Sequence, residues 1–250
     1  MSQTFSSRGL LPDRKPVSLL ALSEGMAVGP ARLVRDLGRC RGAYRWLGRV
    51  PSDASLFQVY VVPPAPAGGS MPPAVEAGDR LRGRHIVPIL GSGMHESGWT
   101  WALSPYAGDI EGVRSLTDVL KMRAGHQMPV YEARVAASQL IDAATDMRRC
   151  GVAFADITGR DVLIDRRGAV RVEVINAMRG ADAPMRDDTC ALGMLVYEML
   201  TGATPSGAFM PPSRLASGVG RAWDRWTERA LGREFDSMSA ASSAMPNHTA

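Results

Sequence analysis

The distribution of apolar residues changes near Gly112, and this change constrains the fold more than any other feature of the sequence. Before it, short stretches rich in β-branched and aromatic residues, such as 56–62 (LFQVYVV), are typical of strands. Residues 63–73 (PPAPAGGSMPP) hold five prolines and two glycines and must form a loop. After Gly112, residues 130–150 place apolar side chains at helical spacing, and residues 189–200 are mostly apolar and end before a glycine. We therefore expect an α+β protein, with a small β-rich half followed by a larger helical half.

Composition excludes several classes of protein. Apolar residues make up 45% of the chain and charged residues 22%, which is typical of a globular protein. No apolar run approaches the roughly 18 residues of a membrane span, and the N-terminus lacks the apolar stretch of a secretory signal. The three cysteines form no C-x-x-C pair and the four histidines lack metal-ligand spacing, which argues against a disulfide framework and a zinc site. We expect a cytoplasmic protein without a membrane span.

Four stretches of the chain, in their order along it, resemble a bacterial protein kinase of the eukaryotic-like Ser/Thr class. They are residues 84–91 (RHIVPILG), 151–165 (GVAFADITGRDVLID), 188–205 (DTCALGMLVYEMLTGATP) and 211–231. The second resembles the catalytic loop and its following strand, and the third resembles the long buried helix of the large lobe. The resemblance implies a two-lobed protein-kinase-like fold, with a small β-rich N-lobe and a larger, mainly helical C-lobe.

The resemblance also implies boundaries along the chain. Residues 26–104 correspond to the N-lobe, and residues 105–239 correspond to the hinge and the C-lobe. Residues 1–25 and 240–250 are expected to be a flexible arm and a flexible tail, since neither shows sustained periodicity. A cleft between two lobes is a usual place for a ligand.

The nucleotide-binding motifs of this family are degenerate in the N-lobe. In the glycine-rich loop only Gly38 keeps its register, while Cys40 and Ala43 replace the second and third glycines. Tyr60 stands at the position of the family's lysine, and a neutral phenol cannot pair with phosphates as an ammonium does. At the hinge, Pro105 has no N–H to donate, so the usual backbone donor would fall near Ala107. The resemblance thus assigns a degenerate nucleotide cleft to Gly38, Arg39, Arg41, Tyr60, Pro105, Tyr106 and Ala107.

The catalytic loop keeps one of its characteristic residues. Asp156 stands at the position of the catalytic aspartate, but Thr158 replaces the lysine two residues later. Asp161 takes the place of the metal-binding asparagine and is the one metal ligand we assign, on condition that a nucleotide with its metal still binds. Without its partners, Asp156 is best interpreted as a remnant that accepts backbone hydrogen bonds in a tight loop.

The position of the family's second metal ligand decides against ordinary catalysis. Val174 occupies it, and valine cannot coordinate a hard cation. After a register shift Asn176 or Glu173 could take its place, but alternation along the strand predicts that Glu173 points to the opposite face. The activation segment that follows is short and lacks the A-P-E motif, which puts the docking of a peptide substrate in doubt as well.

Lysine usage supports the same interpretation. Lys15 and Lys121 are the only lysines among 29 basic residues, and neither falls on the third strand or in the catalytic loop. The sequence therefore predicts a pseudokinase: a binding, scaffolding or regulatory module that has a protein partner, needs no cofactor and transfers no phosphate.

Two other functions stay open at this stage. The first is an atypical kinase, or another nucleotide-dependent transferase, that uses ATP with Mg²⁺ or Mn²⁺. In it, Arg39, Arg41 and Arg45 would hold phosphates, and Asp156 and Asp161 would share the metal. The second is a nucleic-acid binder, suggested by the net charge of +4 and the many arginines. Acidic residues nearly balance the basic ones and the arginine runs are short, so we expect no nucleic-acid partner.

Overall fold

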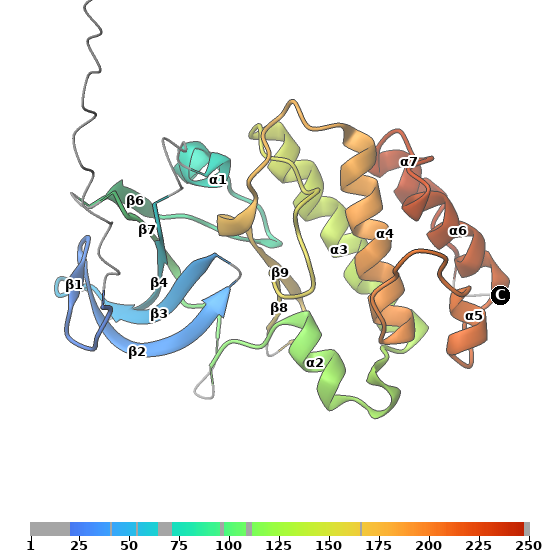
Figure 1. Cartoon of the computed structure of the whole chain (residues 1–250), viewed down its shortest axis with the longest axis horizontal. Coiled ribbons are helices and arrows are strands. Elements are labelled where there is room, and N and C mark those ends of the chain that lie inside the picture. The colour runs from blue at the N-terminus through green and yellow to red at the C-terminus, as the bar shows by residue number, and fades with distance from the viewer. Residues whose placement is uncertain are drawn as a thin grey trace, which may run out of the picture.

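The computed structural model describes residues 21–40, 42–53, 55–64, 72–95, 98–108, 112–165 and 167–247. The N-terminal lobe is built on a six-stranded sheet, which lies to the left in Figure 1. In spatial order its strands are β1 (Ala27–Val28), β2 (Ala31–Cys40), β3 (Ala43–Arg49), β4 (Leu56–Val62), β7 (Thr100–Pro105) and β6 (Gly91–Met94), and neighbouring strands pair antiparallel.

Strand β4 shows why this lobe places polar groups at its inner face. Val59 and Val61 pack with the tryptophans of the sheet's own apolar cluster, while Gln58 and Tyr60 alternate to the other face. Both faces of the strand are buried, which explains its nearly continuous apolar sequence. The alternation therefore directs Gln58 and Tyr60 towards the other lobe.

Shorter elements join the two lobes. Helix α1 (Pro73–Ala77) and the 3-10 turn η1 (Gly78–Arg80) lead into β5 (Ile86–Val87). Strand β5 pairs parallel with β9 (Val170–Glu173), which in turn pairs antiparallel with β8 (Val162–Ile164). This second, three-stranded sheet continues into the 3-10 turn η3 (Val174–Asn176).

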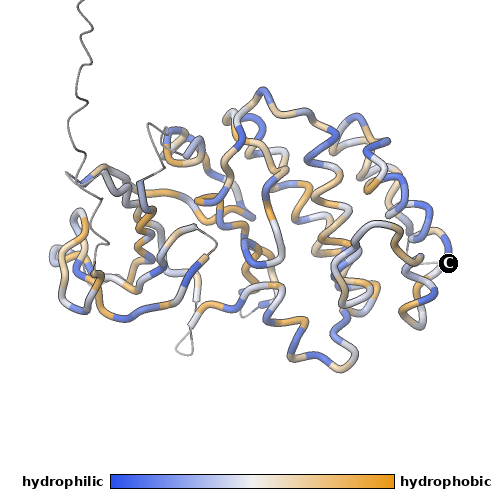
Figure 2. The backbone as a smooth tube through the Cα atoms, in the orientation of Figure 1, coloured by the Kyte–Doolittle hydropathy of each residue, from blue (hydrophilic) through white to orange (hydrophobic). Residues whose placement is uncertain are grey.

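The C-terminal lobe is helical and is organised around α4 (Met185–Thr201), which packs against α3 (Val130–Arg149) and α6 (Arg221–Leu231). The remaining helices are α2 (Leu116–Met122), the 3-10 turn η2 (Ala124–His126), α5 (Pro212–Leu215) and α7 (Met238–Ser243). In Figure 2 hydrophobic residues recur along α3 and α4, and hydrophilic and hydrophobic residues alternate near the C-terminus. Helix α4 is buried over most of its length, whereas α6 buries one face that carries Trp223, Trp226 and Ala230. The expected change from a β-rich to a helical half is confirmed.

The two ends of the described chain are more ordered than the sequence analysis expected. The flexible tail was predicted from residue 240, but α7 extends across it to Ser243, and Ala241 and Met245 are buried. Small side chains allow close approach here, and the indole N–H of Trp226 donates to the Ala241 carbonyl at 2.9 Å. Most of the predicted N-terminal arm, residues 1–20, lies outside the described residues. At its end, the backbone N–H of Gly25 donates to the Leu33 carbonyl at 2.8 Å.

Within the described residues, no helix is long and apolar enough to cross a membrane.

Close packing of α4 on α6 gives a test of this core. A Cβ atom added at Gly193 would lie 2.7 Å from the Cβ of Ala230 and 3.3 Å from the backbone of α6. We expect Gly193→Ala to lower the melting temperature by several degrees. Overpacking costs about 1–3 kcal/mol, against a gain in helix propensity of up to about 1 kcal/mol. Gly42→Ala is the control, because nothing lies within 4 Å of a Cβ there. An unchanged melting temperature for Gly193→Ala would show that the two helices are not packed in this way.

Candidate functional site

A group of buried polar side chains lies where the two lobes meet. We call it the interlobe cluster, and each of its members is at most 7% exposed. The N-terminal lobe contributes side chains from β2, β3 and β4, and the C-terminal lobe contributes them from β9, η3 and the loop before β8. Its members are Cys40, Arg45, Gln58, Tyr60, Asp161, Glu173 and Asn176.

Glu173 is the centre of the cluster. Its carboxylate accepts hydrogen bonds from the Tyr60 hydroxyl at 2.7 Å and from the Gln58 amide, and it forms an ion pair with Arg45 at 3.3 Å. Burial raises the pKa of Glu173, while Arg45 and the hydrogen bonds from its neighbours oppose that shift. The side chain is fully buried but is surrounded by donors, as a buried carboxylate requires.

The predicted direction of Glu173 is wrong. The prediction assumed that strand alternation continues through Val174, but β9 ends at Glu173 and the chain turns into η3 at the next residue. Val174 then enters the hydrophobic core, and Glu173 is the residue that faces Tyr60. Glu173, and not Val174, is therefore the residue of this stretch that contacts β4.

Cys40 connects the tip of the β2–β3 hairpin to the C-terminal lobe. Its thiol is 3.3 Å from a carboxylate oxygen of Glu173 and 3.4 Å from one of Asp161, and it accepts a hydrogen bond from Asn176 at 3.0 Å. Burial and the two nearby carboxylates raise the pKa of Cys40 far above its usual range, which keeps it a neutral thiol. The Cys40 side chain thus fills space between the hairpin and the C-terminal lobe.

The other predicted loop residues do not enter the cluster. Gly38 is exposed, with a positive φ of 86°, and its N–H donates to the Asp36 carboxylate at 2.7 Å. Arg39 is exposed and stacks on the ring of Tyr44. Arg41 lies outside the described residues. Of the three arginines considered for phosphate binding, Arg45 faces the cluster and is paired with Glu173.

Asp161 is buried, and the chain itself supplies its donors. It accepts hydrogen bonds from the backbone N–H of Thr158 at 2.9 Å, from the hydroxyl of Thr158 at 2.7 Å and from the amide of Asn176 at 2.8 Å. Mg²⁺ requires near-octahedral oxygen ligands and usually keeps several waters. Among the described residues, no group of three histidine, cysteine or acidic side chains is placed to hold a metal. A metal ion that bound Asp161 would have to displace these protein donors.

Asp156 is held by the segment that follows η3. Its carboxylate accepts hydrogen bonds from the backbone N–H groups of Met178 and Arg179 at 3.2 and 3.1 Å, and from the Arg179 guanidinium at 3.1 Å. Arg179 also bonds Asp187 at 2.7 Å, and this bond is the main reason why the pKa of Asp187 is lowered. The predicted backbone hydrogen bonds to Asp156 are present, but they come from another segment of the chain. The carboxylate of Asp188 on α4 also holds this loop, because it accepts a hydrogen bond from the Phe154 N–H at 3.0 Å.

The predicted hinge residues lie apart from the cluster. Pro105, Tyr106 and Ala107 line a pocket of about 480 Å³ together with Arg167 and Arg171 of the β8–β9 hairpin. No cluster residue lines this pocket. The structure therefore brings Tyr60 and Asp161 into one site and leaves the three hinge residues in another.

Gln58 is the cluster residue that sequence reasoning missed. It stands opposite Ser104 of β7, and both side chains are fully buried. Among the described residues, neither the Gln58 carbonyl oxygen nor the Ser104 hydroxyl has a hydrogen-bond partner. The single amide side chain in the apolar run LFQVYVV could have indicated a buried polar site, because a buried polar side chain needs hydrogen-bond partners.

Comparisons with known proteins agree with this architecture. No family model matches the sequence, and no curated protein does. The structure is similar to the kinase domain of Mycobacterium tuberculosis PknI, with a TM-score of 0.73 and 20% sequence identity, covering 90% of this chain and 98% of that one. A C20A_R136N double mutant of that domain gives a TM-score of 0.75, also at 20% identity and the same coverage. The kinase PK-1 of the Cydia pomonella granulovirus gives a TM-score of 0.65 at 13% identity, covering 85% of this chain and 92% of that one.

The fold is therefore that of a protein kinase, with a curled β-sheet lobe and a helical lobe. The expected two-lobed α+β architecture is confirmed. At 20% identity the likeness defines a protein-kinase-like domain and leaves its activity to be argued from its own residues.

The Arg45–Glu173 pair gives a direct test of the cluster. We expect Arg45→Met to destabilise the protein by about 3–5 kcal/mol, because it leaves a buried carboxylate without its cation. The double variant Arg45→Met/Glu173→Gln should recover part of this loss, since it removes the uncompensated charge. Thermal unfolding measures both. The control is Arg225→Met on the exposed face of α6. If Arg45→Met costs no more than Arg225→Met, the pair is not buried as described.

Proposed function

We propose that this chain is a kinase-fold binding module that acts on a protein partner as a scaffold or regulator and does not transfer phosphate. The observation that carries the proposal is the interlobe cluster. Donors from three strands of one lobe satisfy the Glu173 carboxylate of the other lobe, in the space where a kinase holds its phosphates and metal. A nucleotide would have to break these buried contacts before it could bind.

The groups that would carry out phosphoryl transfer support the same conclusion. Tyr60 replaces the lysine and is hydrogen-bonded to Glu173, and Asp156 is ion-paired with Arg179. Losing one preorganised electrostatic contact costs about 2.7–4 kcal/mol, or 10²–10³ in rate. Two such losses reduce a typical kinase rate of about 1–100 s⁻¹ to a negligible one, even when their effects are not additive.

The remaining parts of the proposal rest on composition. Acidic residues nearly balance the basic ones, which favours a protein partner over a nucleic acid. The absence of a C-x-x-C pair and of a disulfide pattern in the sequence favours a cytoplasmic location. No resident cofactor is needed for binding of this kind.

One observation favours a second function, a nucleotide-dependent transferase with relocated groups. Arg45, Asp161 and Glu173 converge on one place, and they carry the charges that a phosphate and a metal require. This function needs the cluster to open and its carboxylates to exchange protein donors for a metal. The pseudokinase proposal needs no such rearrangement.

Thermal-shift titration with ATP, in the presence of Mg²⁺ or Mn²⁺, separates the two functions. A nucleotide that binds the folded chain at 100 times its Kd would stabilise it by about 2.7 kcal/mol and raise the melting temperature by several degrees. We expect no saturable shift with either metal, and no labelled phosphate on the protein after incubation with ATP.

The matched controls are Asp161→Ala and Asp156→Asn. A metal-dependent shift that is lost in Asp161→Ala, or phosphate transfer that is lost in Asp156→Asn, would contradict the proposal and establish the transferase instead.

A further inference from the structure

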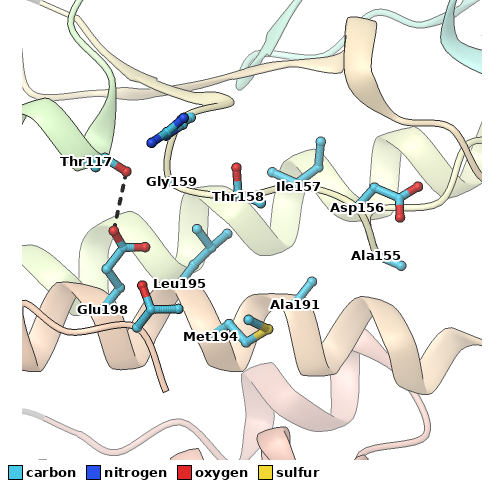
Figure 3. Close-up of a pocket in the computed structure, with 12 residues that line it drawn as sticks. Thr117, Ala155, Asp156, Ile157, Thr158, Gly159, Ala191, Met194, Leu195 and Glu198 are labelled. Carbon is cyan, nitrogen blue, oxygen red and sulfur yellow. Dashed lines mark hydrogen bonds between the residues drawn. The ribbon is translucent and has the colours of Figure 1, made fainter. Parts of the chain in front are cut away.

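Three pockets of the structure differ in the charge of their lining. The first, of about 580 Å³, lies between α4 and the loop that precedes β8, with apolar side chains of α4 on its floor and Glu198 at one end (Figure 3). The second, of about 520 Å³, lies between residues 208–211 and α6, and its charged lining residues are all acidic: Asp224, Glu228 and Glu234. The third, of about 480 Å³, lies at the hinge and is lined by two arginines and one acidic residue. Of these three, the pocket at the hinge, which we call the hinge pocket, is the one suited to an anion.

The hinge pocket combines apolar and cationic residues. Val87, Pro88 and Pro105 contribute apolar side chains, and the two prolines have no N–H to offer a ligand. The β8–β9 hairpin contributes Arg167 and Arg171. The rest of the lining consists of Tyr106, Ala107, Gly108 and Asp165. None of these lining residues comes from β2, β3 or β4, so the pocket lies outside the cleft that the interlobe cluster fills.

The aromatic part of the lining is held in place by close packing. A Cβ atom on Gly108 would lie 2.5 Å from the Tyr106 hydroxyl oxygen and 2.3 Å from the Gly112 carbonyl oxygen. Glycine at this position therefore lets the Tyr106 side chain pack directly on the backbone of the hinge. The Tyr106 N–H also donates to the Leu56 carbonyl at 3.3 Å. A ligand would meet a largely pre-formed surface here, which lowers the entropy cost of binding.

Both arginines keep donors available for a ligand. Arg167 is exposed, and within the described part of the chain its guanidinium has no hydrogen-bond or ion-pair partner. The Arg171 guanidinium lies 3.9 Å from the Asp165 carboxylate, which is beyond hydrogen-bond distance. Asp165 is engaged by the hairpin itself, because one of its oxygens accepts from the N–H groups of Arg167 at 2.8 Å and Ala169 at 2.9 Å. Since a guanidinium carries five N–H donors, most of the capacity of both arginines is unused.

The lining selects the class of ligand. Two guanidinium groups against one carboxylate leave the hinge pocket with an excess of positive charge. The fork of an arginine matches the paired oxygens of a carboxylate or a phosphate. The apolar side chains beside the arginines favour a ligand that also carries apolar groups. Tyr106 is the one aromatic residue among the lining residues, which is little for a surface that stacks nucleic-acid bases.

We propose that the hinge pocket docks an acidic segment of a partner protein, in which a glutamate or aspartate is flanked by apolar residues. The carboxylate accepts hydrogen bonds from Arg167 and Arg171, and the apolar side chains cover Val87 and the two prolines. Because Val87 belongs to the N-terminal lobe and the arginines belong to the C-terminal lobe, the bound segment contacts both lobes outside the cleft. The inference rests on the proposed function, because it specifies the partner of a binding module.

Fluorescence anisotropy with the full chain tests the proposal on three labelled nonapeptides with identical Gly/Ser flanks. Their centres are Leu-Glu-Leu, Leu-Gln-Leu and Ser-Glu-Ser. The second removes the charge and keeps the shape, and the third keeps the charge and removes the apolar groups. We expect Leu-Glu-Leu to bind about tenfold more tightly than either of the others, because charge-assisted hydrogen bonds are stronger than neutral ones and apolar burial adds to them.

Variants of the two arginines connect the binding to the pocket. The double variant Arg167→Gln/Arg171→Gln should bind Leu-Glu-Leu about tenfold more weakly and should no longer distinguish it from Leu-Gln-Leu. Arg167→Gln alone, at an exposed position where folding is not at risk, should lose about threefold. The control is Arg225→Gln, on the exposed face of α6, which should change nothing.

Equal binding of the three peptides, no binding at millimolar concentration, or an equal loss in Arg225→Gln would overturn the docking proposal and leave the proposed lack of phosphate transfer standing. A labelled single-stranded oligonucleotide that binds more tightly than Leu-Glu-Leu, and is lost in the double variant, would assign the pocket to a nucleic acid and overturn the proposal as well. Transfer of labelled phosphate by the chain would instead overturn the proposed function, whatever the peptides do.

Discussion

The arrangement of the two lobes depends on the buried carboxylate of Glu173. Burying an ion costs several kcal/mol unless a counter-ion and hydrogen bonds offset the loss of water. Here the C-terminal lobe supplies the carboxylate, and the N-terminal lobe supplies Arg45, Gln58, Tyr60 and Cys40 around it. Separating the lobes would break all of these contacts. The side chains of the two lobes therefore favour the closed arrangement.

A second constraint is the short connection between η3 and α4, and it has two consequences. Because residues 177–184 cross directly to α4, Arg179 reaches Asp156 and Asp187 together and holds the loop before β8 in place. The same direct path leaves the apolar face of α4 next to Glu198 uncovered. The short connection thus gives both an aspartate held by Arg179 and an open pocket beside α4.

The sequence predicted the architecture well and the geometry of the site only in part. The periodicities predicted the β-rich and helical halves, and the structure places Tyr60 and Asp161 together in the interlobe cluster. The direction of Glu173 was wrong because strand alternation ends where a 3-10 turn begins, and no residue pattern marks that point. The partnership of Arg179 with Asp156 was not predictable, since it joins residues 23 apart through a backbone path that only the fold defines. Helix α7 was missed because a run of small residues has little periodicity, and packing against Trp226 orders it.

The reactivity of Cys40 tests most directly whether the chain's own side chains close the cleft. Its thiol is 1% exposed and bonded within the cluster, whereas Cys150 and Cys190 are partly exposed. Labelling with an alkylating reagent, followed residue by residue by mass spectrometry, gives the three rates in one native sample. We expect Cys40 to react at the rate at which the protein unfolds, far more slowly than the other two, and with no change on addition of ATP and Mg²⁺. Rapid labelling of Cys40 that ATP and Mg²⁺ suppress would show an open nucleotide cleft and would contradict the account.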